Sequence, residues 1–93
     1  MAEVVWLNQA IEQLDQIASY IALFDPAAAG RISTRLVELG QSLETFPNRG
    51  RPASNGTREL VSVRPYILRY EVQGDTVIIL SVRHAARLWD SDI

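Results

Sequence analysis

Apolar residues recur at intervals of three and four along two successive stretches in the first half of the chain. They are Ile11, Leu14, Ile17, Ile21 and Phe24 in the first stretch, and Ile32, Leu36, Leu39, Leu43 and Phe46 in the second. This spacing puts each set on one face of a helix. The first helix is predicted to begin at Asn8, a good N-cap residue. The second is predicted to follow an Asp25 cap, with Pro26 as its first residue, and to stop at Pro47.

The second half of the chain has the shorter, alternating pattern of strands. Strands are predicted over residues 58–63, 66–72 and 76–82, with a short β-prone segment at residues 2–6. In the strand over 66–72, alternation puts Leu68, Tyr70 and Val72 on one face and Ile67, Arg69 and Glu71 on the other. The sequence Gln-Gly-Asp at 73–75 predicts a hairpin turn. The strand over 76–82 is apolar at nearly every position, which predicts the central strand.

These elements give the order β-α-α-β-β-β in a single domain, residues 1–93. Two helices joined by almost no loop are expected to fold back as a hairpin. Their apolar stripe needs a partner, and the face of the sheet is the only predicted surface large enough. The predicted fold is therefore α+β, an N-terminal helical hairpin packed on a small antiparallel sheet. Gly40, inside the second helix, is expected where the two helices approach closely.

Composition removes several classes of function. The chain has no cysteine and one histidine, so it offers no disulfide, no thiolate nucleophile and no Cys- or His-rich metal site. We expect neither a metal nor a cofactor. The N-terminus lacks a basic segment leading into a long apolar run, which favours a cytoplasmic protein without a membrane segment. The net charge of −2 and the pI of about 5.2 argue against a general nucleic-acid-binding protein.

The charges are distributed unevenly along the chain. Residues 1–48 carry two arginines against six acidic residues, a balance of −4, whereas residues 49–93 carry seven arginines against five, a balance of +2. The outward face of the sheet is expected to display Arg69 and Glu71, with Arg58 or Glu59 alongside. Arg83 and His84 are expected at the end of the neighbouring strand. Cross-strand salt bridges are the simpler explanation for such charges, and binding of an anionic partner is the alternative.

His84 and Trp89 each allow two interpretations. Histidine suits proton transfer near neutral pH, and His84 with Glu71 and Arg69 or Arg83 has the residue types that cleavage of RNA requires. A single histidine at a strand end can equally be a structural hydrogen-bonding group. Trp89 lies beyond the last strand beside Arg87. It either folds back onto the domain or serves as an exposed anchor for a protein partner.

Several segments, taken in order, resemble the ParE/RelE superfamily of toxins from toxin–antitoxin systems. They are LNQAIEQLDQIASYIALFDPAAAGR, FPNRGRP, TRELV, YILRYEV and VIILSVRHAAR. RelE-like members of the superfamily are ribosome-dependent mRNA endonucleases, and ParE-like members inhibit DNA gyrase. The nuclease branch typically has an arginine early in the third strand, where this chain has Ile67. The tight FDPAAAGR turn and the RELV and YILRYEV strands are most similar to the ParE-like branch.

The resemblance therefore implies a type II toxin that inhibits DNA gyrase and blocks replication. The target-binding residues that it implies are Arg83, His84, Arg87 and Trp89. The alternative is a ribosome-dependent mRNA endonuclease of the RelE type, in which His84, Arg83 and Arg69 would be catalytic.

The same resemblance implies a protein partner. ParE-like toxins are neutralised by a ParD-like antitoxin, usually a ribbon-helix-helix DNA-binding dimer whose C-terminal tail wraps the toxin. An acidic and apolar tail would suit Arg58, Arg69 and Arg83. Operator DNA would then be bound by the antitoxin, and no direct DNA binding by this chain is expected.

Overall fold

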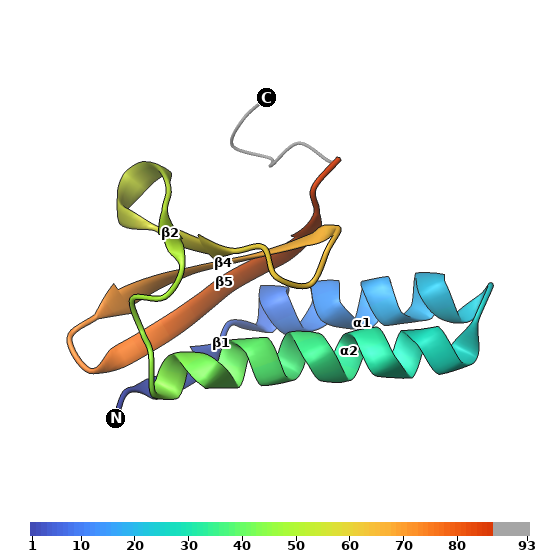
Figure 1. Cartoon of the computed structure of the whole chain (residues 1–93), viewed down its shortest axis with the longest axis horizontal. Coiled ribbons are helices and arrows are strands. Elements are labelled where there is room, and N and C mark those ends of the chain that lie inside the picture. Colours follow the sequence, from blue (N-terminus) through green and yellow to red (C-terminus); the bar gives the residue numbers. More distant parts are fainter. Residues whose placement is uncertain (87–93) are drawn as a thin grey trace.

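The computed structural model describes residues 1–86, which form two helices and a five-stranded sheet (Figure 1). The helices are α1 (Asn8–Ala22) and α2 (Pro26–Gln41). The strands are β1 (Glu3–Trp6), β2 (Arg51–Pro52), β3 (Arg58–Leu60), β4 (Tyr66–Gln73) and β5 (Thr76–His84). Two short 3-10 turns, η1 (Ser42–Glu44) and η2 (Ser54–Gly56), follow α2 and β2.

The two helices begin in different ways. At α2 the prediction is confirmed, because the Asp25 carboxylate accepts a hydrogen bond from the Ala28 N–H at 3.1 Å and Pro26 is the first helical residue. At α1 the predicted Asn8 cap is wrong, since Asn8 is already helical and Leu7 stands at the cap without a side-chain bond. The Leu7 N–H donates to the Ile79 carbonyl at 3.0 Å. Pairing with the sheet thus holds the chain extended up to the first residue of the helix.

The strand order in the sheet is β1-β5-β4-β3-β2. β5 lies between β1 and β4, so it is an interior strand, but the middle strand of the five is β4 rather than β5 as predicted. The strands β2 to β5 pair antiparallel, but β1 pairs parallel with β5, so the sheet is mixed rather than antiparallel as predicted. This parallel pair is possible because α1, α2 and three further strands separate β1 from β5 in the chain. The predicted strand over 58–63 is shorter, and β3 ends at Leu60.

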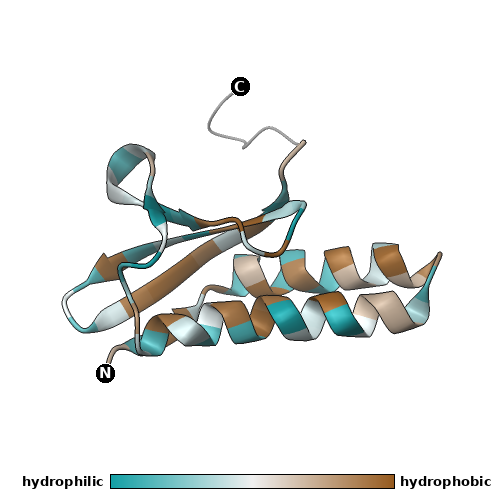
Figure 2. Ribbon diagram, viewed as in Figure 1, coloured by the Kyte–Doolittle hydropathy of each residue, from teal (hydrophilic) through white to brown (hydrophobic). Residues whose placement is uncertain are grey.

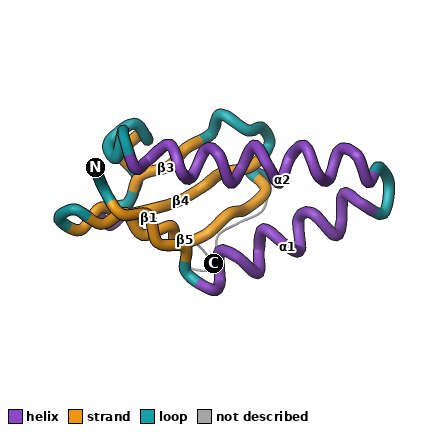
Figure 3. The backbone as a smooth tube through the Cα atoms, turned by 90° about the horizontal axis from the view of Figure 1, so that it is seen from below, coloured by secondary structure: helices purple, strands orange, loops and turns teal. Residues whose placement is uncertain are grey.

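Both helices cover the same face of the sheet, here called the inner face (Figures 1 and 3). Leu36 and Leu43 are fully buried in one core cluster with Leu68, Tyr70, Val77 and Ile79 of this face. The predicted inward orientation of Leu68 and Tyr70 is confirmed, and Val72 packs against the same core while partly exposed. Figure 2 shows hydrophobic residues concentrated along the middle of the sheet and on both helices.

Three residues of the predicted helical stripes lie outside the core. Ile11, Phe24 and Phe46 have 44%, 75% and 61% of their surface exposed. The ends of α1 and α2 nearest their connection extend beyond the edge of the sheet (Figures 1 and 3), which accounts for Phe24. Phe24 lies in that connection, where Tyr20 packs edge-on against it with ring centroids 5.4 Å apart. Ile11 lies in the first turn of α1, and Phe46 lies in the loop after η1.

Gly40 is a site of close packing, but not between the helices as predicted. A Cβ atom at this position would overlap Cζ2 of Trp6 and would lie 2.9 Å from Cδ1 of Ile79. Both neighbours belong to the sheet, so Gly40 allows α2 to approach the strands β1 and β5. The indole of Trp6 fills the space that a larger residue would need.

A β-bulge in β5 decides which side chains share a face near its end. Tyr70 pairs with Ile79 and Arg69 pairs with Ser81, which leaves Leu80 as the extra residue. Beyond it, Val82 and His84 lie opposite Leu68 and Tyr66 of the inner face, and Arg83 lies opposite Ile67. The face away from the helices, the outer face, is made by Val5, Glu59, Ile67, Arg69, Glu71, Ile78, Leu80 and Arg83.

Candidate functional site

Arg58 and Tyr70 hold the loop that follows α2. The Tyr70 hydroxyl donates to the Pro47 carbonyl at 2.8 Å and accepts from the Gly50 N–H at 2.9 Å. Arg58 Nη1 donates to the carbonyls of Asn48 and Gly50 at 3.2 and 2.7 Å. Arg58 is opposite Tyr70 in the β3–β4 pair and therefore lies on the inner face. Of the two residues expected beside Arg69, Arg58 or Glu59, the structure selects Glu59.

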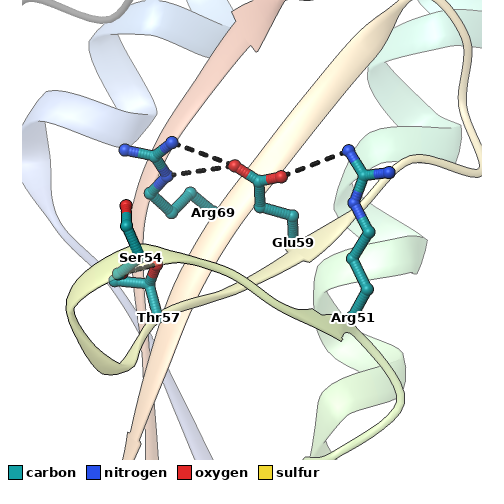
Figure 4. A network of polar contacts seen from close by, with 5 residues as sticks. All are labelled: Arg51, Ser54, Thr57, Glu59 and Arg69. Atoms are coloured by element: carbon teal, nitrogen blue, oxygen red, sulfur yellow. Dashed lines mark hydrogen bonds and ion pairs between the residues drawn. The ribbon is translucent and has the colours of Figure 1, made fainter. Parts of the chain in front are cut away.

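Arg69, Glu59 and Arg51 form an ion-pair network on the outer face (Figure 4). Glu59 Oε2 accepts from Arg69 Nη2 at 2.9 Å and from its Nε at 3.3 Å, and Glu59 Oε1 accepts from Arg51 Nη2 at 3.3 Å. The side chains of Glu59 and Arg69 are only 10% and 16% exposed, whereas that of Arg51 is 62% exposed. The cross-strand salt bridge expected as the simpler explanation for Arg69 is therefore present.

The three side chains of the network carry a formal charge of +1, because two arginines share one carboxylate. The loop from Ser54 to Thr57, closed by a hydrogen bond from Thr57 Oγ1 to the Ser54 carbonyl at 2.6 Å, passes beside Arg69 (Figure 4). Arg83 adds a further cation on the same face, diagonal to Arg69 in the register. An acidic segment of a partner fits this charge distribution.

His84 lies against the inner face rather than the outer one. Its ring contacts the ring of Tyr66 edge-on, with centroids 5.6 Å apart. The Ala86 N–H donates to His84 Nδ1 at 3.1 Å, which assigns the proton of the neutral imidazole to Nε2. The expectation that His84 joins Arg69 on one face is wrong, and the bulge at Leu80 is the physical reason.

A pocket of about 400 Å³ opens between α1 and the end of β5. Its lining is Gln13, Gln16, Ile17, Tyr20, Tyr66, Val82, Arg83 and His84. Since Arg83 belongs to this lining and also lies opposite Ile67, it stands at the border between the pocket and the outer face. Aromatic rings and amides beside a cation suit an aromatic or amide side chain of a protein partner.

Gln13 is a residue of this site that sequence reasoning missed. β1 pairs with β5 only as far as Ile79, and beyond that point Gln13 Oε1 accepts the Val82 N–H at 2.8 Å. The signal was present in the spacing, because Gln13 lies three residues after the buried Ala10 and four before Ile17. A polar residue within an apolar stripe usually has a buried partner.

The structure brings together only part of the predicted site. His84 and Arg83 flank the pocket, Arg69 lies on the outer face, and Arg58 is bound to the loop carbonyls. The three residues of the endonuclease alternative, His84, Arg83 and Arg69, are therefore not gathered on one face. Arg87 and Trp89 lie outside the described residues.

Two negative findings apply to residues 1–86. No helix in this part of the chain is both long and apolar enough to cross a bilayer. Within the same residues, no three His, Asp or Glu side chains are grouped so that they could hold a metal ion.

The family model for the ParE toxin of the type II toxin–antitoxin system parDE matches residues 4–89. This chain belongs to the ParE toxin family. A solved structure described as the chromosomal ParDE toxin–antitoxin system from P. aeruginosa is similar to it, with a TM-score of 0.82 and 27% identity, covering 90% of this chain and 96% of that one. The predicted superfamily and the α+β fold are thereby confirmed.

Two relatives are similar over nearly their whole length. "Toxin RelE2" of Caulobacter vibrioides is 48% identical over 88 residues, which is 95% of this chain and 100% of the relative. "Putative toxin Y4kP" of Sinorhizobium fredii is 41% identical over 86 residues, 90% of this chain and 88% of the relative. The chain is thus a type II toxin of a ParDE-like system.

Proposed function

We propose that this toxin inhibits DNA gyrase and so blocks replication. The target surface that we infer is the end of β5 and the segment after it, with Arg83, His84, Arg87 and Trp89 as its contact residues. Membership of the ParE toxin family supports this function. Gyrase is a cytoplasmic enzyme, so the proposal also places the toxin in the cytoplasm.

The observation that carries the proposal is the separation of the polar groups that cleavage of RNA would need. A nuclease needs an acid, a base and a cation around one phosphate. His84 faces Tyr66 on the inner face, with Nδ1 occupied by the Ala86 N–H. Arg69 lies on the outer face, bonded to Glu59. This arrangement favours a binding surface over a catalytic centre.

The alternative is a ribosome-dependent mRNA endonuclease. It is favoured by the name of the 48% identical relative, "Toxin RelE2". In that case His84 Nε2 would exchange the proton and Arg83 would bind the phosphate, since both residues border the same pocket.

The test is pulse labelling of DNA and protein synthesis in bacteria after controlled induction of the toxin. Gyrase inhibition predicts that DNA synthesis falls first while translation continues, and that the purified toxin stabilises cleaved DNA in a gyrase assay. Arg83→Ala should weaken both effects. Arg35→Ala, at an exposed position of α2, is the matched control and should leave both unchanged. Early collapse of translation, abolished by His84→Gln, would instead establish the endonuclease.

We also infer that a ParD-like antitoxin neutralises the toxin. A solved relative comes from a ParDE system, and the outer-face cations Arg69 and Arg83 fit an acidic tail. Arg58 remains a predicted contact, although its guanidinium is bound to Asn48 and Gly50. The pocket beneath α1 suits an apolar anchor of the same tail. Co-purification with the antitoxin encoded beside the toxin gene, weakened by Arg69→Glu with Arg83→Glu, tests this assignment.

A further inference from the structure

Strand β5 extends beyond the strand that pairs with it on one side. The pairing of β1 with β5 ends at Ile79, where the Leu7 N–H donates to the Ile79 carbonyl and α1 begins. On the other side, β4 pairs with β5 as far as His84. Within residues 1–86, the end of β5 from Leu80 to His84 therefore has a neighbouring strand only on the β4 side.

The side chain of Gln13 takes the place of a strand at one position of this end. Its Oε1 accepts the Val82 N–H at 2.8 Å, although the two residues are 69 positions apart in the chain. Val82 is only 1% exposed. A buried N–H that lacks a partner is costly, because it loses its hydrogen bonds to water without replacement. Gln13 thus satisfies a buried donor that β1 does not reach.

The packing of α1 on the sheet brings Gln13 to this position. Ala10, one turn earlier on the same side of the helix, is fully buried, and its small side chain leaves room for α1 to approach the sheet. Ile17, one turn later, packs against the same core. An amide nitrogen cannot accept a hydrogen bond, so the bond assigns the amide oxygen of Gln13 to the side of Val82. The side chain is therefore held in one orientation at the wall of the pocket.

Two residues of the inferred target surface follow directly after this hydrogen bond. Arg83 and His84 both line the pocket, and they lie on opposite faces of the sheet. The direction of both side chains depends on where the backbone at Val82 lies. A strand end held by one neighbouring strand alone is a place where local opening is easy. The bond to Gln13 adds a constraint from α1 to the one that β4 supplies.

We propose that Gln13 is a positioning residue of the toxin. Through Val82 it fixes the end of β5 against α1, and this sets the direction in which Arg83 and His84 are presented to the target. The role of Arg83 and His84 as contact residues rests on the proposed function, whereas the hydrogen bond from Val82 to Gln13 does not depend on the identity of the target.

Amide hydrogen exchange of the full chain tests whether the bond holds the strand end. Gln13→Met keeps nearly the same side-chain length without the amide oxygen, and we expect exchange at the Val82 amide to become about tenfold faster. Exchange at Val77, which is equally buried but lies opposite Val4 of β1, should stay unchanged. Gln13→Glu keeps an oxygen acceptor and should keep the slow exchange at Val82.

Three results of this measurement would overturn the proposal. An unchanged rate at Val82 in Gln13→Met would mean that the bond does not hold the strand end. An equal rise at Val77 would mean that Gln13 contributes only to the overall stability of the fold. Fast exchange at Val82 in Gln13→Glu would refute the oxygen acceptor as the cause.

Growth arrest of bacteria at matched toxin levels tests the effect on function without assuming a target. Gln13→Met should raise the toxin level needed to halve the growth rate by about fivefold, and this loss should be smaller in an Arg83→Ala background, because Gln13 acts through the end of β5. Gln9→Met, the same change at an exposed position of α1, should have no effect. The same fivefold loss in the Arg83→Ala background, or an equal loss from Gln9→Met, would refute the positioning role.

A gyrase assay separates failure of this proposal from failure of the proposed function. If the unaltered toxin arrests growth but does not stabilise cleaved DNA with purified gyrase, the proposed target is wrong, and the growth comparison still decides the role of Gln13. If the unaltered toxin acts on gyrase and Gln13→Met is equally active, the proposed function stands and the positioning role is refuted.

Discussion

The two faces of β4 are stabilised by different interactions, although neighbouring residues of one strand build both. On the inner face, Leu68 and Tyr70 are fully buried, and the Tyr70 hydroxyl has two backbone partners. On the outer face, Ile67 is partly exposed and Arg69 is held by an ion pair. The inner face therefore carries most of the stability. The outer face can change its partners at little cost to the fold.

Shortening an apolar side chain should reveal the largest difference between the two faces in the free energy of unfolding. Leu68→Ala leaves a cavity in the core and should lower the free energy of unfolding by about 2–5 kcal/mol. Ile67→Ala, one residue earlier on the outer face, should lower it by about 1 kcal/mol because that side chain is already partly hydrated. Urea unfolding of both variants measures the difference. Equal losses would mean that the outer face is packed as tightly as the core.

The hydrogen bonds of the Tyr70 hydroxyl to the loop after α2 should make the next largest contribution to the free energy of unfolding. Tyr70→Phe leaves the Gly50 N–H and the Pro47 carbonyl without their buried partner and should cost about 1–3 kcal/mol. Tyr20→Phe removes the same hydroxyl at a site that is 60% exposed, and it should change stability by less than about 0.5 kcal/mol. Hydrogen exchange at the Gly50 amide should rise in the first variant only. An unchanged exchange rate would show that Arg58 holds the loop alone.

Two glycines of α2 should respond in opposite directions to the same substitution. Gly40→Ala forces a methyl group into Trp6 and should destabilise the fold by about 1–2 kcal/mol, since overpacking outweighs the gain in helix propensity. At Gly30 an added Cβ would meet no atom within 4 Å, so Gly30→Ala should stabilise the fold by about 0.5–1 kcal/mol. Thermal unfolding compares the two. A stabilising Gly40→Ala would contradict the close contact between α2 and the sheet.

The smallest effects should lie within the outer-face network. Arg69→Gln removes the buried arginine of the network and should lower the free energy of unfolding by about 1 kcal/mol. Arg51→Gln should lower it by less than about 0.5 kcal/mol, because that side chain is mostly exposed. Urea midpoints at low and high salt measure both. If Arg51→Gln has the larger effect, the assignment of Arg69 as the principal partner of Glu59 is wrong.

Most of the fold could be predicted because its signals are local. The spacing of Leu36, Leu39 and Leu43 predicts the buried side of α2, and the alternation in residues 66–72 predicts the inner face of β4. The parallel pairing of β1 with β5 could not be predicted in this way, since it depends on how the whole chain returns to its start. Phe24 and Phe46 followed the apolar spacing, but Phe24 lies in the connection between the helices and Phe46 in the loop after η1, and both are mostly exposed.

The site was predicted less well, and the reasons lie in particular residues. Arg58 and Glu59 are neighbours, and only the register of β3 against β4 decides that Glu59 faces Arg69. The pocket depends on Gln13 and Tyr66, which are 53 positions apart in the numbering and meet only in the folded chain. The expectation put the neighbours Arg83 and His84 together at the end of the strand, whereas they lie on opposite faces, and the bulge decides that Arg83 is the outer one. Nothing in the apolar run over 76–82 marks Leu80 as the extra residue.

That extra residue has a consequence for how such a chain can change by insertion and deletion. Removing Leu80 would delete the bulge and leave Val82, Arg83 and His84 opposite the partners that they have now, each on its present face. Removing a residue between the bulge and Arg83 would instead exchange the faces of Arg83 and His84 if the bulge remained, with no substitution at either position. A one-residue change in length along β5 therefore has opposite outcomes at neighbouring positions, depending on whether the residue lost is the unpaired one.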